Sequence, residues 1–335
     1  VFTATAVLVL SAVANAQSYP TKPITMIVPF APGGSTDVIG RVVVEAMRSP
    51  LGQSIVIDNR AGAGGSLGTA AIAKAAPDGY TIGMGNFAPL AVNAALFKKM
   101  SFNPATDLVP IMLIERGPLI LMVRTDSPFK SVADVVKAAK AAPGKLAYAS
   151  GGIGGTHHLS AALFEHVAGI DMIHVPYKSG SESTTAVMGG QVEGTSEASI
   201  IALPHILHDG KFKALATTWT QRLSAYPQLA TATEQGFPEL KIAHWAGVHA
   251  PKGTPTEIMD KVAAAVDQAM KDPAISQRLK AMGIEPMGGT RSDFVRFVLH
   301  RICGFTMEQG EWAAGNNIDK SWTRTAITGE ALRPQ

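Results

Sequence analysis

The sequence predicts an α/β protein with two lobes and a ligand cleft between them. Its 335 residues are too many for one small core and suit two domains of ordinary size. Short β-branched runs alternate with longer, alanine-rich amphipathic stretches, which is the pattern of βα units around parallel sheets. Two glycine-rich segments, 27–37 and 148–158, share one order: an apolar strand, a turn with hydroxyl side chains and a helix start. This shared order suggests that one ligand is held between the two lobes.

The individual elements follow from the same patterns in chain order. The β-branched and apolar runs predict strands at 24–28, 54–58, 81–84, 111–114, 119–123, 146–149, 171–175, 212–216 and 244–249. The amphipathic stretches predict helices at 36–47, 66–75, 131–142, 156–167, 182–188, 255–270, 273–282 and 291–299. Ser131 and Asp134 have N-cap spacing, while Pro255 and Pro273 are expected at the first position of their helices.

Residues 1–16 form an apolar stretch that ends in Ala14-Asn15-Ala16. This composition fits the apolar region and cleavage site of a secretory signal peptide, so we expect the mature chain to begin at Gln17. The stretch is shorter than the roughly 20 apolar residues that a bilayer span needs. No other segment comes close to that length without charges, proline or glycine, so the sequence predicts a soluble exported protein.

The cysteine count and the charge exclude several classes of function. Cys303 is the one cysteine, which excludes an intrachain disulfide, a cysteine zinc cluster and a lipid on a cysteine after the cleavage site. Export without disulfides or an anchor indicates a bacterial periplasm. The net charge of +3 arises from 29 basic and 26 acidic residues without a basic run. Nucleic acid is therefore not an expected partner, because binding to phosphate backbones needs clustered Lys and Arg.

Each glycine-rich turn is interpreted as a site for an anion. Glycine lets the backbone bend so that N–H groups converge, and the following helix adds its positive dipole end and its unpaired first-turn donors. Such donors replace the water around a carboxylate without a buried countercharge, and each charged hydrogen bond contributes roughly 1.5–3 kcal/mol. A handful of them would give micromolar affinity or tighter. The predicted N–H donors are Gly33, Gly34, Ser35, Gly152, Gly154 and Gly155, and the predicted hydroxyl donors are Ser35, Thr36, Ser150 and Thr156.

Three further residues near these turns are candidates for the site. Asp37 could hold an ordered water or an amino group, but a helix-start aspartate more often braces its own turn, and we favour that role. Asn86 and Phe87 follow the predicted strand 81–84, so they should face the cleft at the carboxyl edge of the sheet. Core packing and a place in the ligand wall both remain open for Phe87.

Three patterns that suggest an enzyme or a metal site are weak. The run Gly64-Gly65-Ser66-Leu67-Gly68 matches the nucleophile elbow of hydrolases, but the preceding strand should end near Asp58, too early for that turn. The glycine runs 62–68 and 151–155 lack the spacing of a dinucleotide fingerprint. His157 and His158 are adjacent, so both cannot face one metal from a helix. One of them is expected near the ligand or capping the turn.

The ordered motifs along the chain resemble those of the solute receptors of tripartite tricarboxylate transporters, the Bug proteins. Each motif alone is weak, but together they extend from about residue 19 to about residue 298. The matching motifs are PFAPGGSTD at 29–37, NRAGAGGSLG at 59–68, APDGYT at 76–81, SGGIGGTHH at 150–158, VPYK at 175–178, GGQV at 189–192, Arg222 near Tyr226-Pro227, EQGF at 234–237, WAG at 245–247 and APKGTP at 250–255.

The resemblance implies a type II periplasmic binding protein fold: two α/β lobes with a ligand cleft between them, joined by two crossings. It places lobe one at 17–122 plus 244–335 and lobe two at 123–243, with crossings near Val123 and Ala243. The resemblance also implies contacts with the ligand beyond the two turns, from Phe30, Pro32, His157, Tyr177, Ala198 and Ser199. Glu197 would be unusual beside an anion. It would suit an ammonium group or a protonated partner, or it points to solvent.

The C-terminal segment departs from the family pattern. His300-Arg301-Ile302-Cys303-Gly304-Phe305 interrupts the last expected helix, Glu308 and Trp312 could be displaced counterparts of family residues, and 319–335 is an unusual polar tail. This departure leaves the fold of the end of lobe one undecided, but it does not affect the predicted site.

The resemblance implies a periplasmic solute-binding receptor rather than an enzyme. We expect a monomer that captures a small carboxylate, such as a di- or tricarboxylate, an aromatic acid or an amino acid, and closes by hinge motion. The implied partners are the membrane permease subunits of a tripartite tricarboxylate transporter, or a sensor domain. No cofactor, metal or nucleic acid is expected. The alternative is a hydrolase or another α/β enzyme that uses the glycine-rich turns.

Overall fold

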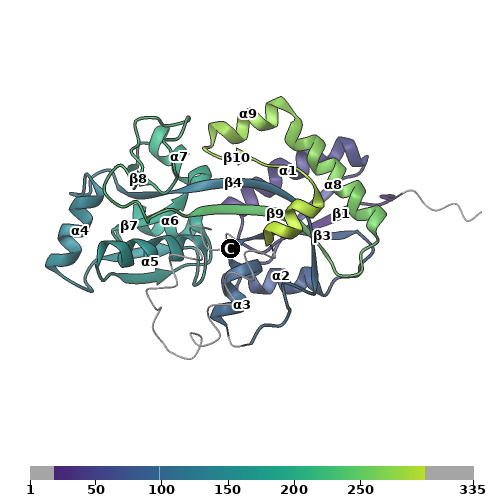
Figure 1. The fold of residues 1–335 in the computed structure, drawn as a ribbon, viewed down its shortest axis with the longest axis horizontal. Coiled ribbons are helices and arrows are strands. Elements are labelled where there is room, and N and C mark those ends of the chain that lie inside the picture. The colour runs from purple at the N-terminus through teal and green to yellow at the C-terminus, as the bar shows by residue number, and fades with distance from the viewer. Residues whose placement is uncertain (1–18, 98, 299–335) are drawn as a thin grey trace, which may run out of the picture.

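The computed structural model describes residues 19–97 and 99–298, which form two α/β lobes joined by the long strands β4 and β9 (Figure 1). The expectations for the signal peptide at 1–16 and for the segment after His300, including Glu308, Trp312 and the tail at 319–335, lie outside these residues. Among the described helices, none is both long enough and apolar enough to cross a bilayer.

Lobe one is built on the strand order β2-β1-β3-β9-β4. Strand β1 (Ile24–Val28) lies parallel to β2 (Ile55–Asn59) and β3 (Thr81–Asn86), and β9 (Ala243–Pro251) is antiparallel to β3. Strand β1 is apolar and almost fully buried, as expected of a central parallel strand covered on both faces. The helices of this lobe are α1 (Ser35–Leu51), α2 (Ser66–Ala73), α3 (Asn93–Leu96), α8 (Thr256–Lys271) and α9 (Pro273–Ala281), with helical turns at Ala63–Gly65 and Ala88–Val92 and a helix at 291–298.

Lobe two is built on the strand order β4-β7-β5-β6, and β8 also pairs with β4. Strand β5 (Ala147–Ser150) lies parallel to β6 (Ile173–Pro176) and to β7 (Gly194–Ala198), while β8 (Phe212–Thr217) is antiparallel to β4. The helices are α4 (Val132–Ala141), α5 (Thr156–Ala168), α6 (Gly180–Met188) and α7 (Ser199–Leu207). Figure 1 shows α4, α5, α6 and α7 gathered at the end of the molecule opposite α8 and β1.

Strand β4 (Leu108–Arg124) is the longest element that crosses between the lobes. Its first part, to Pro118, pairs with β9, and its second part, from Leu119, pairs with β7. The prediction of two separate strands at 111–114 and 119–123 is therefore wrong, because Glu115 to Pro118 continue the ladder. The change of partner lies at Leu119, before the expected crossing near Val123, and β9 begins at Ala243, where the second crossing is expected.

The sequence missed several elements, and it placed the starts of α4 and α8 one residue early. Strands β7 and β10 (Glu285–Pro286), helices α3 and α7, and the helical turns at Ala63–Gly65 and Ala88–Val92 were not predicted. The capping box at Ser131 and Asp134 is present, and Pro273 is the first residue of α9 as expected, with Asp272 as its N-cap. Pro255, however, is the N-cap residue of α8 with an extended backbone, rather than its first helical residue.

Candidate functional site

A cleft of about 400 Å³ lies between the two lobes, where the glycine-rich turns meet. Lobe one and β9 line it with Phe30, Gly34, Ser35, Thr36, Asn86, Ala88 and His244. Lobe two lines it with Gly151, Gly155, Thr156, His157, Ser179 and Gly180. The structure thus brings both turns to one cavity, and the N-termini of α1 and α5 border the same space.

The first turn leads directly into α1. Gly33 has a φ of +79°, a left-handed conformation that favours glycine, whereas Gly34 is extended and acts as the N-cap without a side-chain cap. Asp37 braces this turn: its carboxylate accepts from the Gly33 N–H (2.9 Å), from Arg41 (2.9 Å) and from Asn59 (2.9 Å). Burial acts to raise the pKa of Asp37, but the bonds from Arg41, Gly33 and Asn59 outweigh it and lower that pKa. The favoured bracing role is therefore what the structure shows.

The second turn leads into α5 in the same way. Gly155 is its extended N-cap residue, again without a side-chain cap, and Gly152 and Gly154 have positive φ values of +129° and +77°. The turn closes on itself through a hydrogen bond from the Gly155 N–H to the Gly152 carbonyl (3.1 Å). By contrast, Ser131, Ser179 and Asp272 cap the N-termini of α4, α6 and α9 with their side chains. The N-termini of α1 and α5 thus border the cleft without a side-chain cap, whereas the N-terminus of α6, which also borders it, is capped by Ser179.

The backbone N–H groups of the predicted turn glycines form hydrogen bonds within their own turns. The N–H groups of Gly33, Gly34, Gly152, Gly154 and Gly155 all donate within their own turns, to Asp37, Ala31, Ser150, His158 and Gly152 respectively. The first backbone hydrogen bond of α1 runs from the Val38 N–H to the Gly34 carbonyl, and that of α5 runs from the Leu159 N–H to the Gly155 carbonyl. The N–H groups of Ser35, Thr36, Thr156 and His157 precede these bonds, so they have no helical acceptor. The structure therefore leaves N–H groups without an acceptor at the first helical residues rather than at the turn glycines, Gly152 and Gly154 included.

The hydroxyl groups on α1 are oriented by buried partners. The Nδ1 atom of His244 lies 2.7 Å from Oε1 of Glu115, and its Nε2 atom lies 3.4 Å from the Ser35 hydroxyl. Asn86 donates to the Thr36 hydroxyl (3.0 Å) and is itself fixed by the Ala88 N–H (3.2 Å). With its acceptor side occupied, the Thr36 hydroxyl can donate its own proton into the cleft, which suits an anion.

His244 is fully buried on β9, beside this hydroxyl array. Burial acts to lower its pKa, but the charge and hydrogen bond of Glu115 and the charge of Glu197 outweigh burial, so the pKa of His244 is raised. A protonated His244 donates from both ring nitrogens, so its Nε2–H points to Ser35 and turns the Ser35 hydroxyl into a donor toward the cleft. Glu115 is completely buried on β4, with Oε1 2.7 Å from Nδ1 of His244.

The prediction that left Glu197 free to point to solvent is wrong. Glu197 is completely buried at the end of β7, and Oε1 lies 2.9 Å from Nε2 of His157. The carboxylate also accepts from the Ala198 N–H (2.9 Å) and contacts the Ser183 hydroxyl (3.5 Å). A Cβ on Gly180 would come within 2.6 Å of it, so glycine is needed there. Glu197 thus orients His157 from beneath the cleft wall.

Three residues behind the second turn hold it without facing the cleft. The Ser150 hydroxyl contacts Nε2 of His174 (2.6 Å), and the His158 ring stacks on the His174 ring at 4.0 Å. Burial lowers the pKa of His158 to about 3, with a contribution from His174, and lowers the pKa of His174 to about 4. A neutral His158 can accept the Gly154 N–H at Nδ1 (3.1 Å). His157 also bonds to the turn, because its Nδ1 accepts from the Gly151 N–H (3.3 Å).

The other predicted contact residues lie around or behind the cleft. Phe87 is buried and packs edge-on against Trp245 at 6.4 Å. Tyr177 is half-buried and donates to Gln191 (3.1 Å), and Ser199 donates to the Gly283 carbonyl (3.0 Å). Of the predicted contact residues, those that line the cleft are Phe30, Gly34, Ser35, Thr36, Asn86, Gly155, Thr156 and His157. Those that do not line it are Pro32, Gly33, Asp37, Phe87, Ser150, Gly152, Gly154, Tyr177, Ala198 and Ser199.

The residues at the cleft that the sequence missed are Ala88, Gly151, Ser179, Gly180 and His244, together with Glu115 behind His244. A signal was available for Glu115, because a carboxylate inside the apolar run 111–123 is either a break or a buried functional group. His244 gave no comparable signal, since its partner lies on another strand far away in the sequence.

The nucleophile elbow and a metal site are not present in the described part of the chain. Strand β2 ends at Asn59, Ser66 begins α2, and the Ser66 hydroxyl accepts a hydrogen bond from Asn93 (2.9 Å). Ser66 is thus not raised on a strand-to-helix turn. Among the described residues, no group of three His, Cys, Asp or Glu side chains could hold a metal ion.

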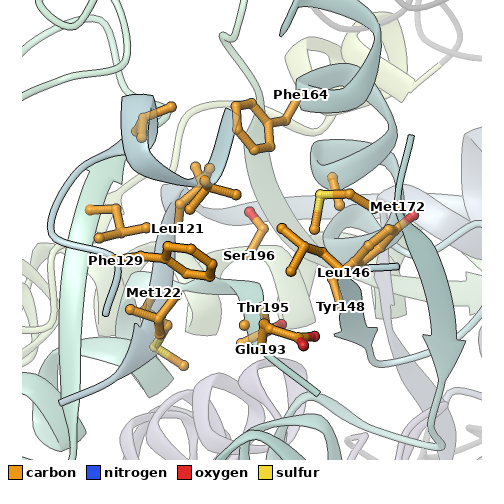
Figure 2. Close-up of a pocket in the computed structure, with 16 residues that line it drawn as sticks. Leu121, Met122, Phe129, Leu146, Tyr148, Phe164, Met172, Glu193, Thr195 and Ser196 are labelled. Atoms are coloured by element: carbon orange, nitrogen blue, oxygen red, sulfur yellow. The ribbon is translucent and has the colours of Figure 1, made fainter. Parts of the chain in front are cut away.

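A second cavity of about 530 Å³ lies inside lobe two, but its chemistry does not suit a carboxylate. Figure 2 shows Leu121, Phe129, Leu146, Phe164 and Met172 around it. The Ser196 hydroxyl within it already bonds to Ser160 (2.6 Å), and the Glu193 carboxylate accepts from the Ala147 N–H (2.7 Å). An anion placed there would lose its water without gaining donors, so the cleft is the candidate site.

The sequence matches a family model and known proteins of one family. A family model described as a tripartite tricarboxylate transporter family receptor matches residues 39–303. BugT of Bordetella pertussis is 35% identical over 305 residues, which cover 90% of this chain and 93% of BugT. A UPF0065 protein from the tcbD-tcbE intergenic region of Pseudomonas sp. strain P51 is 35% identical over 274 residues, 82% of this chain and 81% of that protein.

Solved structures agree with the sequence matches. Rpa4515 of R. palustris with adipate has a TM-score of 0.82 and 34% identity, and the match covers 85% of this chain and 95% of that one. MatC of Rhodopseudomonas palustris with bound malate has a TM-score of 0.81 and 30% identity, over 86% and 98% of the two chains. The periplasmic binding protein BugD has a TM-score of 0.82 and 30% identity, over 87% and 97%.

Proposed function

The chain belongs to the family of tripartite tricarboxylate transporter receptors, and on that premise we propose that it is a periplasmic solute receptor whose cleft captures a small organic carboxylate. The observation that carries this proposal is the pair of uncapped helix N-termini, α1 and α5, that face one cleft from opposite lobes. Their free N–H groups and dipoles favour an anion. The similar proteins solved with adipate and malate support the same ligand class.

The charges around the cleft also favour a carboxylate over a cation. Among the described residues, the cleft is lined by no Lys, Arg, Asp or Glu side chain. Its buried acids, Glu115 and Glu197, are each paired with a histidine, so neither offers a free negative charge. The donors that remain are the first-turn N–H groups and the hydroxyls of Ser35, Thr36 and Thr156, because both ring nitrogens of His157 are engaged by Glu197 and the Gly151 N–H. A ligand carboxylate can therefore exchange its water shell for these donors.

We assign the ligand contacts to residues from both lobes, so binding and closure are coupled. Ser35 and Thr36 would hold the carboxylate from lobe one, while Thr156 and His157 would hold it from lobe two. A ligand that contacts the residues of both lobes stabilises the closed form of the two lobes, and this stabilisation grows with the contacts that the ligand makes to the second lobe. Permease subunits of a tripartite tricarboxylate transporter, or a sensor domain, would then recognise the closed form.

A hydrolase is the weaker candidate, because the position of Ser66 at the start of α2 does not form a nucleophile elbow. Ser150 lies close to His174, but Ser150 is completely buried and does not line the cleft, so a substrate carbonyl could not reach it.

The test is a binding screen on ligand-free protein, prepared by denaturation and refolding so that bound solute is removed. Mono-, di- and tricarboxylates, aromatic acids and amino acids are added singly, and the melting temperature is measured. At least one carboxylate should raise it in a concentration-dependent way, and the same compound should be recovered unchanged. Turnover of an ester or amide panel, without stabilisation by any carboxylate, would contradict the receptor.

The location is tested separately. A periplasmic extract of cells that express the full sequence should contain protein that begins at Gln17, because cleavage is expected after Ala16. An uncleaved N-terminus in the cytoplasmic fraction would contradict export.

A further inference from the structure

A buried histidine and a buried glutamate lie together at the cleft. His244 lines the cleft from β9 and is 3% exposed, and Glu115 on β4 is completely buried. Oε1 of Glu115 lies 2.7 Å from Nδ1 of His244, and among the described residues neither Glu115 oxygen has another hydrogen-bond partner. An ionised carboxylate that is buried without a cation is costly, so Glu115 favours a proton on His244.

The two ring nitrogens of His244 have different partners. Nδ1 faces the carboxylate, so it carries a proton in either charge state of the ring. Nε2 lies 3.4 Å from the Ser35 hydroxyl, and a hydroxyl can both donate and accept. Without a proton, Nε2 can only accept from Ser35, and the serine oxygen then turns its lone pairs to the cleft. With a proton, Nε2 donates to Ser35, and the serine proton is free for a ligand anion.

His157, the other histidine in the lining, does not have this freedom. Its Nδ1 atom accepts from the Gly151 N–H (3.3 Å), so the ring proton lies on Nε2, which faces Glu197 at 2.9 Å. A neutral ring satisfies both contacts, and a second proton on Nδ1 would break the bond from Gly151. Among the described residues that line the cleft, His244 is therefore the group that can gain a proton without losing a hydrogen bond.

The charged groups around His244 come from several elements. Glu115 on β4 and Glu197 on β7 both favour a proton on His244, and together they outweigh burial and raise its pKa. The acid on α1, Asp37, is already paired with a cation, α5 brings the neutral ring of His157, and β3 faces the cleft with an amide. A ligand carboxylate beside the serine hydroxyl adds a further negative charge. Binding of the ligand therefore strengthens the binding of the proton.

We propose that His244 is a proton-binding site of this receptor, and that the cleft captures its carboxylate together with one proton. The inference rests on the proposed function, because it needs a carboxylate at the N-termini of α1 and α5. The proton comes from solvent and binds Nε2 of His244, while the Ser35 proton turns to the ligand, and no covalent bond of the ligand changes. Each of the two ligands strengthens the binding of the other, so the receptor holds its carboxylate more tightly as the pH falls.

The test is calorimetric titration of the full mature chain with malate, adipate, hexanoate and benzoate, which are all ionised above about pH 7. Each titration is repeated from about pH 7 to about pH 9 in buffers with different ionisation enthalpies, because a proton taken from the buffer changes the measured heat. The main variant combines Glu115→Gln with His244→Gln, since His244→Gln alone would leave Glu115 buried without a cation. Ser35→Ala is a second variant that keeps the buried pair. His208→Gln, an exposed histidine outside the cleft, is the control.

The parent should take up a proton, or part of one, for each carboxylate bound. Its affinity should fall as the pH rises, by at most about tenfold per pH unit. The double variant should take up no proton and bind with an affinity that does not change with pH, and Ser35→Ala should flatten the fall. His208→Gln should behave as the parent does.

Three results would overturn the proton site but leave carboxylate capture intact. They are an affinity of the parent that does not change with pH, proton uptake that persists in the double variant, and a fall in affinity that is as steep in Ser35→Ala as in the parent. Failure of every acid to bind would overturn the receptor itself.

Discussion

Gly64 in lobe one lies against the backbone of Ile153 in lobe two, so closely that a Cβ on Gly64 would be 2.7 Å from the Ile153 carbonyl oxygen. A second contact of this kind joins Gly154 to Asn93, where a Cβ on Gly154 would lie 2.8 Å from Oδ1. These two contacts come from the turns that border the binding region. In both contacts a glycine of one lobe lies so close to the other lobe that a side chain at the glycine position would not fit.

Replacement of Gly64 by alanine should hinder this closure. The new methyl group would push against Ile153, so the ligand should bind less tightly, and small-angle scattering should show a larger radius of gyration at saturation. Gly210→Ala is the matched control, because Gly210 has nearly the same φ (+59° against +58°) and nothing within 4 Å of its Cβ position. Both variants should lose about 1 kcal/mol of stability from the left-handed backbone. Equal ligand affinity in the two variants would show that the Gly64 contact does not limit closure.

Thr156→Val tests the hydroxyl on the second helix. Valine keeps the shape of threonine but removes a donor that has no hydrogen-bond partner among the described residues. The affinity for the carboxylate should fall by about 1–3 kcal/mol, while the melting temperature without ligand changes little. Thr25→Val, on β1 in lobe one, serves as the control and should bind as the parent does. Unchanged affinity in Thr156→Val would remove Thr156 from the site.

Glu115→Gln tests the buried charge pair behind Ser35. The pKa of His244 is raised in the folded protein above its usual 6.5. The pair therefore contributes its full stabilisation of the folded state below pH 6.5, and this stabilisation is lost as the pH rises through the pKa of the folded protein. The parent should exceed the variant by about 1–3 kcal/mol in unfolding free energy near pH 5.5, and by less near pH 8.5. Chemical denaturation at both pH values measures this. A difference that grows with pH would contradict a protonated His244, and exposed Glu285→Gln is the control.

His174→Gln tests the neutral histidines behind the second turn. Burial lowers the pKa of His174 to about 4 in the folded state, whereas the unfolded chain binds the proton near 6.5. The folded state therefore loses stability as the pH falls from about 6.5 to about 4, by at most about 1.4 kcal/mol per pH unit. The variant lacks this titration and should lose less stability than the parent over that range. If the parent, His174→Gln and the exposed control His208→Gln lose the same unfolding free energy per pH unit, the titration of His174 is excluded as a source of acid sensitivity.

The strands and helices around the cleft could be predicted from sequence because their patterns are local. Strand β1 coincides with the predicted 24–28, and α5 begins at Thr156 as expected. Strand β7 was missed because Thr195, Ser196 and Glu197 are polar, and their burial depends on partners from other elements. A strand whose polar groups are satisfied by distant residues shows no apolar alternation in its own sequence.

The site could be predicted in outline but not in its donors. The two glycine-rich turns and the helix starts after them were evident, and so was Asp37 as a brace. Which N–H groups remain free depends on where Asp37, His158 and the Gly152 carbonyl lie in space, which no spacing along the chain reveals. The pairing of Glu115 with His244 joins two strands far apart in sequence, and it was missed for the same reason.

The most direct test of the central claim is a crystal structure of the protein with the carboxylate that stabilises it most. The account predicts that one carboxylate group accepts hydrogen bonds from both lobes at once: from the N–H or hydroxyl groups of Ser35 or Thr36 on α1, and from those of Thr156 or His157 on α5. A carboxylate that touches the N-terminus of one helix alone, or that lies in the apolar cavity of lobe two, would contradict it.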